Sequence, residues 1–303
     1  MSMPICVMDI GGTKLAAGIM LDDHTIHYRQ ELPTLADEGA EAVFARLTTL
    51  GAQVIQAYGR AHPWSPLAAI GIASCGQIEP TTGQVVHATD NIPGWTGLPL
   101  GERVTAHFGI PVFVENDVNC FALAEAAIGA GAAYRHLLVV GVGTGVGGGI
   151  VIDRRLYSGW QGKAGEVGHL CVEPVNGRAC TCGLTGCLES YTATRIMVTE
   201  SGYASIHALA AAYQAGQAIA AVDDAALWLG RGLATVAHIL GPEAMIVGGS
   251  IDLLGTRYLD RVRQSYTHHA MLSYRQMPIL PAALAADTGL LGAGLLAHQG
   301  LAR

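Results

Sequence analysis

Residues 7–23 are VMDIGGTKLAAGIMLDD, and residues 140–155 are VGVGTGVGGGIVIDRR. In each stretch an apolar, β-branched run enters a Gly/Thr turn and leaves through a second apolar run that ends near an aspartate. This pattern is typical of a β-hairpin whose backbone is exposed at its tip. Because it occurs twice, it predicts a duplicated fold with two related lobes.

The rest of the chain alternates between short apolar runs and longer segments of helical periodicity. Strands are expected at 67–73, 111–114 and 244–247, and helices at 41–58, 121–130 and 225–240. Alternation of this kind predicts the α/β class. We expect an N-terminal lobe over 1–117, joined by a C-terminal helix at about 290–303, and a C-terminal lobe over 118–289.

Composition narrows the range of functions. The chain has 303 residues, 50% of them hydrophobic, which is enough for a large core and two domains. A net charge of -7 without a Lys/Arg cluster argues against a nucleic-acid partner. The N-terminus has neither the basic start nor the long apolar region of a signal peptide, and the longest uncharged stretch, 201–222, is interrupted by Tyr, His, Gln and Gly. These features predict a cytoplasmic protein without a membrane partner.

The hexapeptide DIGGTK at 9–14 places a carboxylate at a strand end, next to glycines whose N–H groups a polyphosphate can approach closely. The run GTGVGGG at 143–149 is a second candidate of the same kind. Neither fits a Walker A loop, and either one alone could be an ordinary glycine hairpin. Two such loops in a duplicated frame favour phosphate binding.

The segment ENDVN at 115–119 lies between an expected strand and an expected helix. Asp117 at this junction is a candidate general base. Asp and Asn are also the preferred helix-capping residues, so capping is the alternative interpretation.

One histidine and three cysteines lie at short separations after GEVGH: His169, Cys180, Cys182 and Cys187. This set is sufficient for a tetrahedral structural zinc site. The alternatives are buried or redox-active thiols, and Cys171 is a competing ligand. Zinc here would also fix Glu189, so the metal is expected to act as a scaffold and not as a catalyst.

Taken together, DIGGTK, ENDVNCFALAE, GTGVGGG, GEVGH, CTCGLTGCLE and VGGS resemble the ROK family (repressors, open reading frames and kinases), specifically its sugar kinases. The match runs from Asp9 to about Gly294. The resemblance implies an actin-like ATPase (ribonuclease H-like) fold, with two lobes around a cleft that binds a sugar and ATP with Mg²⁺. Family members are commonly dimers or tetramers, so a homodimer or homotetramer is expected.

The resemblance also implies roles for individual residues. Asp117 matches the catalytic base, and His169, Cys180, Cys182 and Cys187 match the ligands of a structural Zn²⁺. The matching phosphate and nucleotide positions are Asp9, Gly11, Gly12, Thr13, Lys14, Gly143, Thr144, Gly145, Gly147, Gly248 and Gly249. The matching sugar positions are Asn91, Asn116, Asp117, Glu166, His169 and Glu189.

Two segments bear on the substrate. Residues 91–95, NIPGW, look like the glucokinase version, whereas residues 73–76, ASCG, look closer to the N-acetylmannosamine kinase version. Phosphorylation of glucose at its 6-hydroxyl is favoured, followed by N-acetylmannosamine and then fructose. A sugar-responsive repressor is disfavoured, because the first strand is expected near Pro4 and leaves no room before it for a helix-turn-helix.

Overall fold

The computed structural model describes residues 3–89, 92–284 and 287–302, and the chain divides into two compact units. Unit 1 comprises residues 1–124, 156–164 and 284–303, and unit 2 comprises 125–155 and 165–283. Each unit contains one five-stranded sheet and helices, so the predicted α/β class is confirmed.

The sheet of unit 1 has the order β3-β2-β1-β4-β7. Its strands are β1 (Ile5–Ile10), β2 (Lys14–Met20), β3 (Ile26–Pro33), β4 (Ala69–Ser74) and β7 (Val112–Asn116). The first three strands are antiparallel neighbours, while β4 and β7 run parallel to β1. The expected hairpin and both expected strands of this unit are therefore present.

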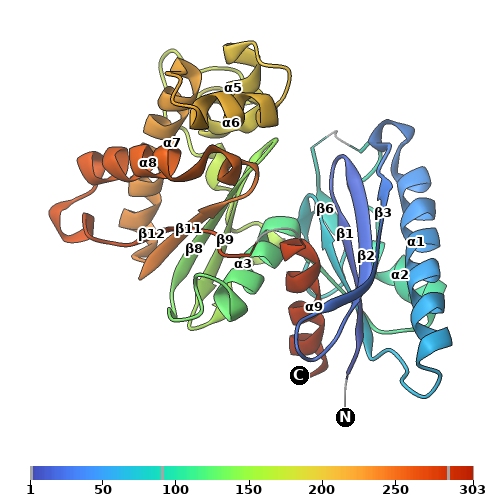
Figure 1. Ribbon diagram of the computed structural model, residues 1–303. Helices are drawn as coiled ribbons and strands as arrows, with labels where there is room; N and C mark the ends of the chain where they lie inside the picture. Colours follow the sequence, from blue (N-terminus) through green and yellow to red (C-terminus); the bar gives the residue numbers. More distant parts are fainter. Residues whose placement is uncertain (1–2, 90–91, 285–286, 303) are drawn as a thin grey trace. The chain divides into compact units, whose positions relative to one another are not determined.

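Helices cover both faces of this sheet (Figure 1). Helix α1 (Ala40–Ala61) packs on one face and α9 (Thr288–Leu301) on the other, while α2 (Leu100–Phe108) packs against β7. Alternation along β1 explains the layers, because Met8 packs in the cluster with α1 whereas Val7 packs with α9. A short hairpin of β5 (Gln77–Ile78) and β6 (Val85–His87) completes the unit.

Unit 2 repeats the strand order of unit 1, as β10-β9-β8-β11-β12. The strands are β8 (Leu137–Val142), β9 (Val146–Ile152), β10 (Arg155–Leu156), β11 (Ala244–Gly248) and β12 (Ile279–Pro281). Here too an antiparallel hairpin, β8–β9, is followed by strands parallel to its first member. The duplication predicted from the two glycine-containing stretches is therefore confirmed, because both units have the same strand order.

The remaining helices include α3 (Asp117–Ile128), which begins in unit 1 directly after β7. In unit 2 they are α4 (Glu189–Thr192), α5 (Thr194–Ser201), α6 (Ile206–Gln214), α7 (Ala220–Leu240) and α8 (Gly255–His269). Helices α7 and α8 pack against each other, and α4 and α5 pack on α7. Across the described residues, no helix has the length and apolarity needed to cross a membrane.

Glycines allow α9 to lie close to its neighbours in unit 1. A Cβ on Gly292 would collide with the backbone carbonyl of Cys120 in α3. Gly59 near the end of α1, by contrast, is exposed and has open space at its Cβ position. The two glycines offer the same substitution in opposite environments.

We predict that Gly292→Ala destabilises the protein by about 1–3 kcal/mol, because the added methyl group overpacks the α9–α3 contact. Gly59→Ala should instead stabilise it by about 0.5–1 kcal/mol, because alanine loses less conformational entropy in a helix. Urea unfolding of both variants measures the two effects. Equal stability changes in the two variants would show that the close approach at Gly292 is not a constraint.

Candidate functional site

Acidic side chains gather at one edge of the unit 1 sheet. Because β1, β4 and β7 are parallel, their carboxyl ends meet at the same edge, where Asp9 and Glu115 lie in one row of the register on either side of Ala73. Asp117 follows β7 directly. In open α/β sheets this edge is the usual place for ligands.

Asp9 is the most strongly perturbed carboxyl group at this edge. Burial raises the pKa of Asp9 to about 7, and the negative charge of Asp117 contributes to the rise. Gly289 in the first turn of α9 leaves room for the carboxylate, since a Cβ there would lie 2.6 Å from Asp9 Oδ2. A nearby cation would return this carboxyl to its ionised form, so the site suits a divalent metal ion.

The predicted phosphate turn, residues 9–14, is stabilised by hydrogen bonds from Thr34, which was not predicted as a site residue. Gly11 N–H donates to the carbonyl of Lys14 at 3.0 Å, which closes the turn. The buried Thr34 then donates its hydroxyl to the carbonyl of Gly11 at 2.6 Å, and its N–H to the carbonyl of Thr13 at 3.0 Å. The turn is therefore fixed while Gly12 and Thr13 remain exposed.

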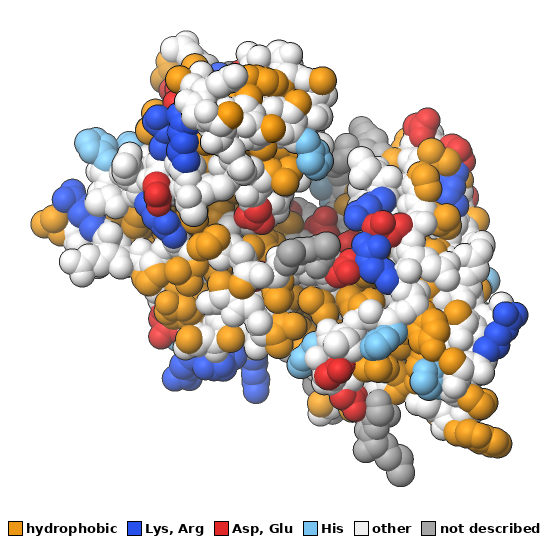
Figure 2. All heavy atoms as spheres, viewed as in Figure 1, with side chains coloured by type: hydrophobic (Ala, Val, Ile, Leu, Met, Phe, Trp, Pro, Cys, Tyr) orange, Lys and Arg blue, Asp and Glu red, His pale blue; other side chains and the backbone are white. Residues whose placement is uncertain are grey.

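Lys14 belongs to a network of charged side chains over β2 and β3, where blue and red side chains meet in Figure 2. Its Nζ lies 2.6 Å from Glu31 Oε1, and Arg29 links Glu31 to Asp287 at 2.8 and 2.6 Å. Hydrogen bonds from Arg29 and Lys14 lower the pKa of Glu31 to about 2. Because ion pairs between exposed side chains are weak in water, a phosphate group can compete with Glu31 for Lys14.

Asn116 caps helix α3. Its Oδ1 accepts hydrogen bonds from the N–H groups of Val118 and Asn119 at 2.9 and 3.1 Å, and its Nδ2 donates to the carbonyl of Gly76 at 2.9 Å. Asp117 is the first residue of the helix, and its Oδ1 accepts from Val118 N–H at 2.9 Å. The capping role considered for Asp117 from the sequence is thus carried mainly by Asn116.

A buried carboxylate supports this junction from behind. Glu115 is 2% exposed and accepts hydrogen bonds from Asn119 Nδ2 at 3.0 Å, Asn116 N–H at 2.9 Å and Ser158 Oγ at 2.9 Å. Burial raises the pKa of Glu115. Ser158 was not a predicted site residue, because it lies 43 positions away in sequence and only the fold brings it to Glu115.

In unit 2 the two predicted glycine turns lie next to each other. Residues 143–145 form the tip of the β8–β9 hairpin and 146–147 begin β9, while Gly248 ends β11, the parallel neighbour of β8, and Gly249 follows it. Gly249 has a φ of 100°, and a Cβ there would lie 2.7 Å from the carbonyl of Val142. Both turns thus present backbone at the same sheet edge.

Glu189 connects the β8–β9 glycine hairpin to the loop of residues 180–187 (the cysteine loop). Its carboxylate is nearly buried, and Oε2 accepts from Val146 N–H at 3.0 Å, inside the predicted phosphate loop. Oε1 accepts from Thr181 Oγ1 at 2.8 Å, between Cys180 and Cys182, and from Arg195 Nη2 at 3.3 Å. A shift in either loop therefore reaches the other through one side chain.

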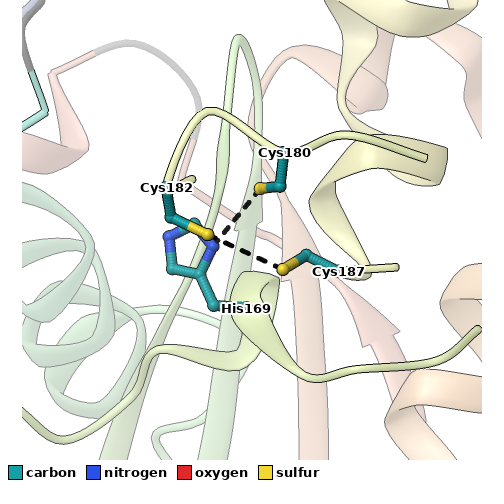
Figure 3. Close-up of side chains that lie close together, drawn as sticks. All are labelled: His169, Cys180, Cys182 and Cys187. Carbon is teal, nitrogen blue, oxygen red and sulfur yellow. Dashed lines mark hydrogen bonds between the residues drawn. The ribbon is translucent and has the colours of Figure 1, made fainter. Parts of the chain in front are cut away.

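The structure brings the four predicted metal ligands together (Figure 3). The ligand atoms of His169, Cys180, Cys182 and Cys187 all lie within 4.8 Å of one another. His169 Nδ1 lies 3.6 Å from Cys180 Sγ, and the sulfurs of Cys182 and Cys187 are 3.7 Å apart. Tetrahedral zinc with bonds of about 2.0–2.3 Å requires separations of about 3.3–3.8 Å, so the residues fit this ion.

The other predicted residues near this cluster are distributed as follows. His169 Nε2 points toward Glu166, with 3.9 Å to Oε2. Cys171 lies opposite Cys187 in a β-bridge but is not a member of the four-ligand group. Asn91, predicted to contact sugar, lies outside the described residues.

The chain resembles several characterised proteins over nearly its whole length. It is 32% identical to a glucokinase of Halalkalibacterium halodurans over 314 residues, covering 96% of this chain and 94% of the relative. It is 33% identical to an N-acetylmannosamine kinase of Salmonella typhi over 307 residues, covering 98% and 99%. A Streptomyces griseus ROK glucokinase, solved in complex with glucose and AMPPNP, superposes with a TM-score of 0.85 at 30% identity, covering 98% of this chain and all of that one.

Two sheets of equivalent order, each built on a glycine hairpin, define the actin-like ATPase fold, as the sequence predicted. The ROK family model matches residues 5–300. The chain belongs to the ROK family.

We predict that Asp9→Asn stabilises the ligand-free protein at pH 8 but not at pH 4. Because the pKa of Asp9 is higher in the folded state than in the unfolded state, the folded state loses stability as pH rises from about 4 through 7. An asparagine cannot ionise and avoids this loss, which is at most about 4 kcal/mol. Denaturant unfolding at both pH values measures it, with the exposed Asp37→Asn as the matched control. A stability difference independent of pH would contradict the burial argument.

We also predict that Cys182→Ser releases zinc and lowers the unfolding temperature, because a tetrahedral site loses one ligand. Cys171→Ser should retain the zinc of the wild-type protein, since Cys171 lies outside the four-ligand group. Metal analysis and thermal unfolding of protein purified under reducing conditions measure both. Full zinc content in the Cys182 variant, or none in the wild type, would rule out this ligand set.

Proposed function

We propose that this chain transfers the γ-phosphoryl group of ATP to the 6-hydroxyl of glucose. The chain is an ATP-dependent sugar kinase. What is proposed beyond this class is that its substrate is glucose. The glucokinase relatives support it, as does the likeness of residues 91–95 to the glucokinase version of that segment.

The observation that carries the catalytic proposal is the relation between Asp9 and Asp117. The charge of Asp117 contributes to the raised pKa of Asp9, so the two carboxyl groups lie close enough to interact at one sheet edge. Two carboxylates of this kind have distinct uses in phosphoryl transfer. We assign Asp9 to the metal–phosphate side and Asp117 to the sugar side, where it accepts the proton of the attacking hydroxyl.

Positioning accounts for most of this chemistry, because phosphoryl transfer has a loose transition state and the proton leaves the hydroxyl late. Asn116 and Glu115 hold the start of α3, and with it the backbone of Asp117. Mg²⁺ bound with ATP would neutralise charge on the transferring group, and Asp9 is the residue whose perturbed carboxyl suits it. The glycine turns at 11–12, 143–147 and 248–249 supply backbone N–H donors for the nucleotide.

Glu166 and Glu189 are the proposed acceptors for sugar hydroxyls in unit 2, and His169 is a proposed donor to a sugar oxygen. A sugar that lacks or inverts one hydroxyl would leave a polar group unpaired, which is the basis of strong discrimination. His169 would bind zinc through Nδ1, which faces the cysteines, and keep Nε2 for a hydroxyl. Asn116 is a further residue proposed to contact the sugar.

N-acetylmannosamine is the second candidate, because residues 73–76 are closer to that type and a relative of this name is 33% identical. In the structure the two conflicting segments meet, since buried Trp95 Nε1 donates to buried Ser74 Oγ at 3.3 Å. The two segments are therefore in contact, and neither of them alone determines which sugar is bound.

The substrate is tested by ADP release with excess Mg²⁺-ATP against glucose, N-acetylmannosamine, N-acetylglucosamine, mannose, fructose and allose. We expect kcat/KM for glucose to exceed that of each other sugar at least about tenfold, a difference of about 1.4 kcal/mol in transition-state binding. A higher value for N-acetylmannosamine would replace the first candidate by the second. Sugar binding without ADP release from any sugar would refute the kinase activity.

We predict that Asp117→Asn lowers kcat by about 10²–10⁴ while ATP affinity stays within about threefold, because the base acts only on the sugar hydroxyl. The amide keeps an oxygen that can accept from Val118 N–H. Steady-state kinetics and calorimetric titration with ATP measure the two quantities, and Asp37→Asn serves again as the surface control. Turnover within tenfold of wild type would remove Asp117 from the role of base.

A further inference from the structure

Cys171 is a fourth cysteine sulfur beside the four-ligand group, which contains three, and it is not itself one of the ligands. It is exposed, whereas Cys187 is buried. The two residues oppose each other in an antiparallel bridge that connects the segment after His169 to the segment before Glu189. The proximity is therefore built into the backbone of this loop.

The hydrogen bonds around this bridge define its type. Val172 N–H donates to the carbonyl of Gly186 at 2.8 Å, and Leu188 N–H donates to the carbonyl of Leu170 at 2.8 Å. These bonds flank Cys171 and Cys187, which therefore form a non-hydrogen-bonded pair. Opposed residues in such a pair have Cα atoms about 4.5 Å apart and side chains in close proximity. That spacing lies within the range of about 4.4–6.8 Å that disulfides require.

We propose that Cys171 and Cys187 form a disulfide when the protein meets hydrogen peroxide, and that this bond expels the metal from the four-ligand group. The exposed Cys171 thiolate attacks peroxide, becomes a sulfenic acid and releases hydroxide. The sulfur of Cys187 then attacks this sulfenic acid, which forms the S–S bond and releases a second hydroxide. The two sulfurs together lose two electrons, the two hydroxides take protons from solvent to become water, and the metal loses one of its four ligands.

Loss of the metal would affect the β8–β9 glycine hairpin through Glu189. Cys180 and Cys182 flank Thr181, whose hydroxyl binds Glu189 Oε1, while Glu189 Oε2 holds Val146 N–H. Loosening the cysteine loop therefore frees the support of the predicted phosphate loop. This consequence for activity rests on the proposed kinase function, whereas the disulfide and the metal release do not.

Trypsin separates the two cysteines cleanly. Cleavage after Lys163, Arg178 and Arg195 leaves Cys171 in peptide 164–178 and all three cysteine ligands in peptide 179–195. A Cys171–Cys187 disulfide therefore links the two peptides, whereas a disulfide within the ligand set leaves them separate. Fragmentation of the linked pair identifies which of the three sulfurs is bonded.

The experiment treats zinc-loaded wild type and Cys171→Ser with peroxide, follows zinc release with a chromogenic chelator, and maps disulfides by mass spectrometry after alkylation. We expect a 164–178/179–195 crosslink through Cys187, in step with zinc release, reversed by dithiothreitol and added Zn²⁺. Cys171→Ser should release zinc at least about fivefold more slowly. A crosslink confined to Cys180, Cys182 and Cys187, or equal release rates in both proteins, would overturn the proposal. ADP release before and after treatment is a separate readout. If the protein had no kinase activity, zinc release and disulfide mapping would still test the proposal.

Discussion

The burial of Asp9 beside the negative charge of Asp117, at the edge of the unit 1 sheet, is the constraint on which the proposed chemistry depends. Asp9 is buried next to the charge of Asp117, and the fold holds it there although its ionised form is disfavoured. Thr34 fixes the turn after Asp9, and Asn116 and Glu115 fix the start of α3. An arrangement that costs stability when empty is well suited to bind a cation and a substrate hydroxyl.

Unit 2 meets a different requirement with the same sheet topology. Its glycine hairpin must expose backbone N–H groups without losing its shape, and Glu189 supports it from the cysteine loop. Thr194 adds to this support, because its N–H and hydroxyl both donate to the carbonyl of Gly143 at 2.8 Å. The cysteine cluster therefore matters for the geometry of the loop as much as for local stability.

Features with a local sequence signature were predictable. Both glycine hairpins follow from alternation and turn residues, and the four ligand residues lie within 19 positions, so their spacing alone indicated a common site. Helix α3 was expected from residue 121 but begins at Asp117, because the cap at Asn116 was not recognised as the start. The short helices α4 and α5, between Glu189 and Ser201, lack a clear apolar period and were not expected.

Contacts between distant positions could not be read from the sequence. Thr34 reaches Gly11 across 23 positions, Ser158 reaches Glu115 across 43, and Glu189 reaches Val146 across 43. None of these residues belongs to a local sequence pattern that identifies its partner, and each pair is brought together by the tertiary structure. The hydrogen bonds that hold the site residues in place therefore depend on the tertiary fold, whereas the candidate catalytic and binding residues themselves lie in local sequence motifs.

Phosphoryl transfer to the 6-hydroxyl of glucose is tested most directly by a ³¹P NMR spectrum of the product formed from glucose and Mg²⁺-ATP. Phosphorylation of the 6-hydroxyl couples phosphorus to the two protons of a CH₂ group, so we predict a triplet from the sugar phosphate that grows as ADP appears. A doublet would mean that a ring hydroxyl is the acceptor. ATP that stays intact in the presence of glucose would contradict the proposed activity toward this sugar.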